Sequence, residues 1–134
     1  MAVSNMHQEV WDRLIWHLRH FILVSTPINE FDIEMRLRDY LETGGFLVNE
    51  QKRSSLGRQD LVVISGKERF CMELKMNADA SCFEQLDRYS RDADGLILMC
   101  WKASKKVKKI FELAKKSAKI PIDLIEIRNQ CKMV

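Results

Sequence analysis

Zinc-binding and disulfide-type cysteine patterns are missing from this 134-residue sequence. Its four cysteines, Cys71, Cys82, Cys100 and Cys131, form no CxxC pair and no zinc-ligand spacing with histidine, which argues against a zinc site. Cys71 and Cys100 fall inside apolar runs, so we expect them to be small core residues. This use of cysteine predicts a reducing, cytoplasmic location.

The sequence also lacks the segments that direct a protein to a membrane or anchor it there. Its start, MAVSNMHQEVWDRL, has polar and acidic residues where a signal peptide has its apolar stretch. No apolar run is long enough to span a bilayer. There is no internal repeat, low-complexity segment or linker. We therefore predict one domain over residues 1–134, with no membrane partner.

Two helices are predicted at the start of the chain. Apolar residues at helical spacing place the first over residues 6–24, with Asn5 as its cap. Thr26 as a cap and Pro27 as the first helical residue predict a second helix, which ends at the two glycines that follow residue 43. The apolar stripe of this helix puts Glu34 at the edge of its buried side. A plain surface glutamate is an equally good interpretation.

Three strands are predicted next, over residues 46–52, 60–65 and 69–76. The last two are joined by Gly66-Lys67, a two-residue turn of the hairpin type. The short connections allow the three strands to form an antiparallel meander.

The rest of the chain alternates helices and strands. A helix ends near residue 93, a buried strand covers residues 96–101, a helix capped by Ser104 ends near residue 118, and a last strand covers residues 120–127. Strands separated by helices join by parallel crossovers. We therefore predict an α/β fold with a mixed central sheet flanked by helices, in the order α-α-β-β-β-α-β-α-β.

Three charged residues are expected to meet in the predicted hairpin. Asp60 opens one strand, and Glu73 and Lys75 share one face of the next, because side chains alternate along a strand. If Asp60 points to that face, two carboxylates need a cation between them, and such oxygen ligands suit Mg²⁺ or Mn²⁺. The metal can polarise a phosphoryl oxygen, and Lys75 can orient an attacking water. Two acids alone would suggest glycoside hydrolysis, whereas the neighbouring lysine argues for phosphodiester chemistry.

A simpler interpretation of these residues stays open. Glu73 and Lys75 could be a surface ion pair, and short D…ExK matches arise by chance. The context favours a site, because Asp60 heads the preceding strand and Glu34 on the second helix could add a third metal ligand.

Over residues 27–101 this pattern resembles the PD-(D/E)XK nuclease superfamily. The core of that superfamily is a helix, three strands, a helix and a strand. The resemblance implies that Asp60 and Glu73 bind the metal and that Lys75 serves the nucleophilic water. It also implies a glutamate from the preceding helix, either Glu34 or its rival Glu30.

A further motif lies in the helix after the third strand, Gln85-Leu86-Asp87-Arg88-Tyr89. This QxxxY pattern resembles that of the RecB-like and phage exonuclease branch, in which the two residues support the active site or contact DNA. The residue before Asp60 is Gln59, where the family name has proline, and many branches lack that proline. The resemblance implies a restriction-endonuclease-like core, with residues 1–25 as an extra helix and residues 102–134 as a basic helix and final strand.

Lysines are concentrated in one stretch of a chain whose net charge is only +3. Such a run is usually a solvated helix face. Few acids accompany it, and Lys105 and Lys106 fall in the first helical turn, where the helix dipole disfavours cations. Contact of these lysines, Lys109 included, with a DNA backbone is therefore an equally good interpretation. The lysines are Lys102, Lys105, Lys106, Lys108, Lys109, Lys115, Lys116 and Lys119.

Taken together, these features predict a Mg²⁺- or Mn²⁺-dependent deoxyribonuclease, with DNA as the expected substrate and RNA as an alternative. Arg53 and Arg58, in the loop before Asp60, are placed to touch a phosphate, although they could be ordinary loop charges. A non-catalytic nucleic-acid-binding or assembly module on the same fold is the alternative function. The choice between endonuclease and exonuclease stays open. The small size makes a homodimer or a partner protein plausible.

Overall fold

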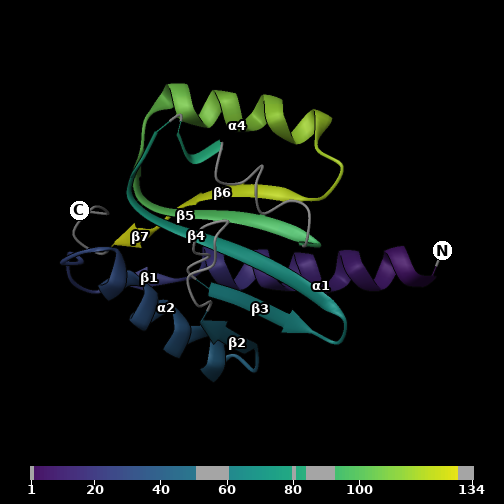
Figure 1. The fold of residues 1–134 in the computed structure, drawn as a ribbon. Helices are drawn as coiled ribbons and strands as arrows, with labels where there is room; N and C mark the ends of the chain where they lie inside the picture. Colours follow the sequence, from purple (N-terminus) through teal and green to yellow (C-terminus); the bar gives the residue numbers. More distant parts are fainter. Residues whose placement is uncertain (1, 51–60, 80, 84–92, 130–134) are drawn as a thin grey trace.

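The computed structural model describes residues 2–50, 61–79, 81–83 and 93–129. Within these ranges the chain forms a five-stranded mixed sheet with helices on both faces (Figure 1). The predicted class, a mixed central sheet flanked by helices, is confirmed. In their order across the sheet, the strands are β2 (Leu47–Glu50), β3 (Leu61–Ser65), β4 (Glu68–Ala78), β5 (Gly95–Ala103) and β6 (Ile122–Glu126).

Strands β2, β3 and β4 form the predicted antiparallel meander. The turn between β3 and β4 consists of Gly66 and Lys67, and Gly66 has a φ of 61°, which glycine adopts without strain. Strand β4 pairs in parallel with β5, and β5 with β6, as predicted for the later strands. Strand β4 is therefore the middle strand and joins the antiparallel and parallel halves of the sheet.

The sheet separates two apolar cores (Figure 1). Helices α1 (Ala2–Arg19) and α2 (Glu30–Thr43) pack on one face and form the first core. Helix α4 (Lys105–Ser117) packs on the other face and forms the second core. The first core includes Leu14, Leu18, Ile33, Leu37, Leu41, Phe70, Met72, Leu74, Ile97 and Met99. The second includes Val62, Cys71, Cys82, Leu96, Leu98, Cys100, Val107 and Phe111.

The first helix differs from its prediction at both ends. It begins at Ala2, so Asn5 is not its cap, and it ends at Arg19 instead of residue 24. After the helix, burial alternates along residues 21–24, with Phe21 and Leu23 in the first core. This period of two suits a strand, and β1 (Ile22–Leu23) pairs in parallel with β7 (Arg128–Asn129). The predicted last strand, over residues 120–127, corresponds to β6, and β7 lies beyond its end.

The start of α2 was also predicted wrongly. Asn29 is the cap, because its side chain accepts a hydrogen bond of 2.9 Å from the amide of Asp32. The Asp32 carboxylate in turn accepts one of 2.9 Å from the amide of Ile28. The first bond satisfies an amide of the first helical turn, and the second holds the residue before the cap, so the helix begins at Glu30 and not at Pro27.

The later elements agree better with the sequence. Ser104 caps α4 as predicted, with its hydroxyl accepting a hydrogen bond of 3.2 Å from the amide of Val107. Residues 82 and 83 are helical, and the rest of the helix predicted to end near residue 93 lies mostly outside the described residues. None of the helices in the described ranges is long and apolar enough to cross a membrane.

Candidate active site

Glu73 and Lys75 lie in strand β4 and share the face of the sheet that α4 covers. Phe70, Met72 and Leu74 point into the first core, and Cys71 points into the second. Because side chains alternate along a strand, Glu73 and Lys75 follow Cys71. The predicted common face is confirmed by the ion pair between the two side chains.

The pair has one buried and one accessible member. Lys75 Nζ lies 3.8 Å from Glu73 Oε1, and the Glu73 side chain is 6% exposed while that of Lys75 is 24% exposed. Burying a carboxylate is costly, and the Lys75 ammonium offsets part of that cost. The geometry therefore differs from the simpler interpretation, a surface ion pair, in which both charges remain hydrated.

Two further polar groups surround the pair, and sequence reasoning did not include them in the site. Burial raises the pKa of the Cys82 thiol. The charges of Asp79 and Glu73 raise it further, while a backbone hydrogen bond at Asp79 and the charge of Lys75 oppose them. Cys82 is thus close enough to sense all three charged residues. They gather where β4 ends, since β4 continues to Ala78, two residues beyond its predicted end.

Asp79 is held at the end of β4 by the next turn of the chain. Its carboxylate accepts hydrogen bonds from the hydroxyl and the amide of Ser81, which lower the pKa of Asp79, and the charge of Lys75 adds to this effect. Lys75 is thus paired with Glu73 in the strand, and its charge also acts on Asp79 beyond the end of the strand.

Of the two glutamates of α2 predicted as candidates for the site, burial favours Glu34. Glu34 is 2% exposed, whereas its rival Glu30 is an exposed residue at the first position of α2. The prediction that Glu34 lies on the buried side is confirmed. However, α2 packs in the first core, on the sheet face opposite to that of Glu73 and Lys75. A role for Glu34 as a metal ligand stays a prediction.

Several predicted site residues lie outside the described residues. These are Asp60, Gln85, Tyr89, Arg53 and Arg58. Strand β3 begins directly after Asp60, and its first residue, Leu61, pairs with Met72, which precedes Glu73. Within the part of the chain that the structure describes, no group of three or more His, Cys, Asp or Glu could hold a metal ion.

The lysines of α4 divide into two sets. Lys108 pairs with Glu126 at 3.4 Å, and Lys115 pairs with Asp123 at 2.9 Å, so these two fasten the helix to β6. The predicted nucleic-acid-binding residues Lys105, Lys106 and Lys109 are exposed.

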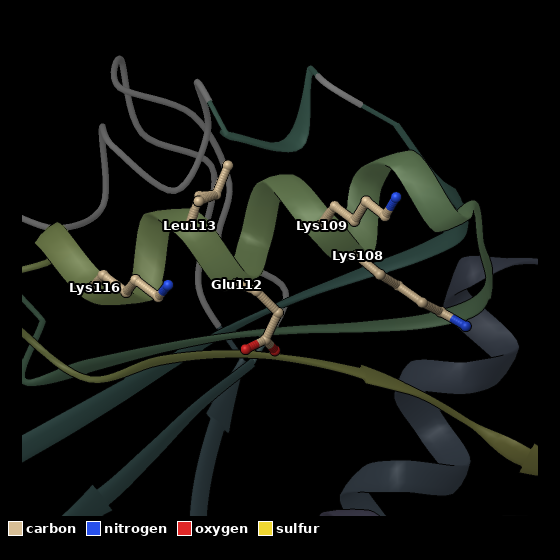
Figure 2. A pocket seen from close by; sticks show the side chains of 5 residues that line it. All are labelled: Lys108, Lys109, Glu112, Leu113 and Lys116. Atoms are coloured by element: carbon tan, nitrogen blue, oxygen red, sulfur yellow. The ribbon is translucent and has the colours of Figure 1, made fainter.

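The outer side of α4 carries a shallow hollow lined by lysines (Figure 2). Leu113 points away from the sheet there and is 65% exposed, whereas Glu112 points towards it. The other lining residues are Lys108, Lys109 and Lys116. This part of the surface combines positive charge with an exposed apolar side chain.

Comparisons of the chain with protein-family models, curated proteins and solved structures give no significant match.

Proposed function

We propose that this protein is a metal-dependent nuclease that hydrolyses nucleic-acid phosphodiester bonds, with DNA as the expected substrate, on a restriction-endonuclease-like core. The observation that carries the proposal is the pair formed by Glu73 and Lys75. A buried carboxylate stands 3.8 Å from a partly accessible ammonium, on one face of the middle strand. The site thus offers a metal ligand and a cation for a phosphate in one place.

The proposed metal is Mg²⁺ or Mn²⁺, and Glu73 suits it. A charged oxygen donor that is largely removed from water is the type of ligand that these ions take, and a divalent cation would offset the cost of burying it. Asp60, which directly precedes β3, is the second proposed ligand. Glu34, whose helix packs on the opposite face of the sheet, stays a separate proposal for a third. When bound, the ion would polarise a phosphoryl oxygen and lower the pKa of a coordinated water.

Lys75 has the role of positioning the water and stabilising charge. Its ammonium can hold a water by donating a hydrogen bond to it, and it can stabilise the negative charge that grows on the phosphoryl oxygens. Its partial exposure supports this role, because the ammonium must meet a substrate that arrives from solvent.

The remaining residues of the proposal come from the sequence motifs. Gln85 and Tyr89 would support the site, and Arg53 and Arg58 would contact a phosphate beside the metal. Lys105, Lys106 and Lys109 would bind the nucleic-acid backbone further away. Such contacts fix the position of a substrate without reading its sequence.

Cleavage assays with defined substrates test the proposal. Lys75→Ala should lower the rate of Mg²⁺-dependent cleavage at least about 100-fold, because it removes a charge that acts on the transition state. Asp60→Asn and Glu73→Gln should do the same. The control is Lys67→Ala, which removes an exposed lysine from the turn before the same strand and should leave the rate unchanged. The panel would contain linear, nicked and circular DNA, single strands and RNA, with Mg²⁺ or Mn²⁺.

A wild-type protein that cleaves no member of this panel would overturn the nuclease proposal. The alternative is a non-catalytic nucleic-acid-binding or assembly module on the same fold. The exposed lysines of α4 favour that alternative, since they need no metal to bind a phosphate backbone. It predicts salt-sensitive DNA binding that neither EDTA nor Lys75→Ala changes.

A further inference from the structure

The carboxyl ends of β4 and β5 bring a second lysine, Lys102, near Lys75 of the candidate active site. The strands run parallel, with Lys75 opposite Cys100 and Asn77 opposite Lys102. Lys102 therefore stands two residues beyond Cys100, the partner of Lys75, close to the ends of the two strands. At about 4.8 Å between strands and 3.3 Å per residue, the Cα atoms of Lys75 and Lys102 are about 8 Å apart. Two lysines this far apart can contact neighbouring phosphates of one strand.

Helix α4 continues this line of positive charge. It begins where β4 and β5 end (Figure 1), and its first two residues are Lys105 and Lys106. Lys102, Lys105 and Lys106 are exposed, and no ion pair joins them to an acid within the ranges that the structure describes. They therefore differ from Lys108 and Lys115, which are paired with carboxylates of β6.

Two carboxylates of the described residues lie at this end of the sheet besides Glu73: Asp79, which accepts hydrogen bonds from Ser81, and Glu126. Glu126 accepts a hydrogen bond of 2.8 Å from the amide of Ala103 through one oxygen and pairs with Lys108 at 3.4 Å through the other. Glu126 is therefore not an ion-pair partner of Lys102, Lys105 or Lys106.

We infer that a nucleic-acid strand passes over the carboxyl ends of β4 and β5, with its phosphates contacted in turn by Lys75, Lys102 and the pair Lys105–Lys106. Ligands of parallel sheets commonly bind at this edge. This inference rests on the proposed function and adds the path of the substrate to it. Lys102 is a contact that the sequence did not single out, and the path leads away from the outer hollow beside Leu113.

The shape of the charged surface favours a nucleic acid over an anionic membrane. Proteins that lie on a membrane surface insert large apolar side chains next to their basic residues. Leu113 is the exposed large apolar residue of α4, and it lies two turns beyond Lys106. Lys102, Lys105 and Lys106 instead lie at and just beyond the end of β5, near the buried carboxylate of Glu73.

Two double variants on the same helix test the path. Lys105→Ala with Lys106→Ala removes two charges from the start of α4, and Lys116→Ala with Lys119→Ala removes two exposed charges in its last turn and just beyond its end. Lys116 lies about 16 Å along the helix from Lys105. Binding of fluorescent single-stranded and duplex DNA would be measured in EDTA at several salt concentrations, so that no cleavage interferes.

The first double variant should reduce the slope of log affinity against log salt by about 1.4 for single strands and 1.8 for duplexes. Adding Lys102→Ala should reduce it again, and the second double variant should leave it unchanged. Equal effects of the two double variants, or no effect of either, would overturn the inference. So would a protein that binds anionic phospholipid vesicles through these lysines and binds no DNA.

Cleavage assays separate this inference from the nuclease proposal. If both hold, the first double variant raises KM with little change in kcat, because its lysines bind substrate and do not touch the reacting atoms. If the wild type binds DNA along this path but cleaves nothing, the nuclease proposal fails and the path stands. If it cleaves and the lysines have no effect on KM or binding, the path fails and the nuclease proposal stands.

Discussion

At Gly95 the packing between α1 and the sheet leaves no space for a side chain. A Cβ atom built there would lie 2.5 Å from a ring carbon of Trp11 and 2.8 Å from one of Phe70. Trp11 and Phe70 also contact each other, with ring centroids 5.9 Å apart. The first residue of β5 is therefore restricted to glycine by two aromatic rings that arrive from α1 and β4.

We expect Gly95→Ala to lower the free energy of unfolding by about 2 kcal/mol, the usual cost of forcing one methyl group into a packed core. Urea denaturation would measure it. Trp11→Leu in the same chain should recover part of the loss, because it removes the nearest ring. Additive losses in the double variant would contradict this explanation.

At the same scale, the sequence predicted the common face of Glu73 and Lys75 because the alternation of a strand is a local property. It missed the neighbouring Asp79 and Cys82 because their positions depend on where β4 ends. The apolar pattern predicted an end at residue 76, while pairing with β5 extends the strand to Ala78. A contact between distant strands thus decided which residues join the site.

Among the elements, β6 is tied to helices on both faces of the sheet through one buried carboxylate. Asp123 is 6% exposed and accepts a hydrogen bond of 3.0 Å from Arg19 of α1. It also pairs with Lys115 of α4 at 2.9 Å, and it accepts a hydrogen bond from the amide of Leu124. Asp123 thus satisfies a backbone amide of β6 while it holds α1 and α4 at the same edge of the sheet.

We expect Asp123→Asn to lower the free energy of unfolding by about 2 kcal/mol, since two hydrogen bonds with charged partners are lost. Asparagine keeps the shape and can still accept from Leu124. The control is Asp39→Asn, which changes an exposed carboxylate of α2 and should have little effect. Thermal unfolding at neutral pH would compare them, and equal losses would contradict a specific role for Asp123.

The same contact predicts a dependence on alkaline pH. Burial lowers the pKa of Lys115, but the hydrogen bond from Lys115 to Asp123 and the charges of Asp123 and Glu112 outweigh it, so the pKa is raised above 10.5. A lysine whose pKa is higher in the folded state than in the unfolded state stabilises the fold. This stabilisation is fully present below the unfolded-state pKa and is lost as the pH rises through the folded-state pKa. The difference in stability between wild type and Asp123→Asn should therefore be constant to about pH 10 and shrink above it. A difference that stays constant to pH 12 would contradict this assignment.

The boundaries of the helices and strands show which features of the fold the local sequence can predict. The start of α2 was predicted at Thr26 and Pro27 because both are common at helix starts. In the structure Arg36 donates hydrogen bonds to the carbonyl and the hydroxyl of Ser25, which holds the preceding segment outside the helix. Strands β1 and β7, of two residues each, are too short to give a periodic pattern, and they pair across almost the whole chain.

For the whole molecule, the sequence predicted the mixed sheet because each strand is a separate apolar run with a recognisable connection. It did not predict how the helices distribute over the two faces. That distribution places the basic helix α4 on the same side as Glu73 and Lys75, and it places Glu34 on a helix of the other side. The face of a sheet on which a helix packs depends on its crossover, and periodicity alone does not determine it.

Metal binding should register in the stability of the whole chain. If Glu73 is a ligand, Mn²⁺ at 100 times its dissociation constant should raise the free energy of unfolding by about 2.7 kcal/mol. Glu73→Gln and Asp60→Asn should abolish the increase seen in a thermal unfolding assay, and Asp39→Asn should retain it. Glu34→Gln then decides separately whether the helix glutamate is a ligand. An equal increase in all four variants would mean that Mn²⁺ binds elsewhere.

The position of β4 in the middle of the sheet makes the candidate site intolerant of small insertions. A shift of β4 by one residue would present Leu74 and Met76 where Glu73 and Lys75 now stand, and it would turn both charges into the first core. Because β3 and β5 hold the strand from both sides, such a shift must break two ladders at once. Single-residue insertions or deletions anywhere between residues 68 and 75 are therefore expected to be selected against more strongly than most substitutions in the same segment.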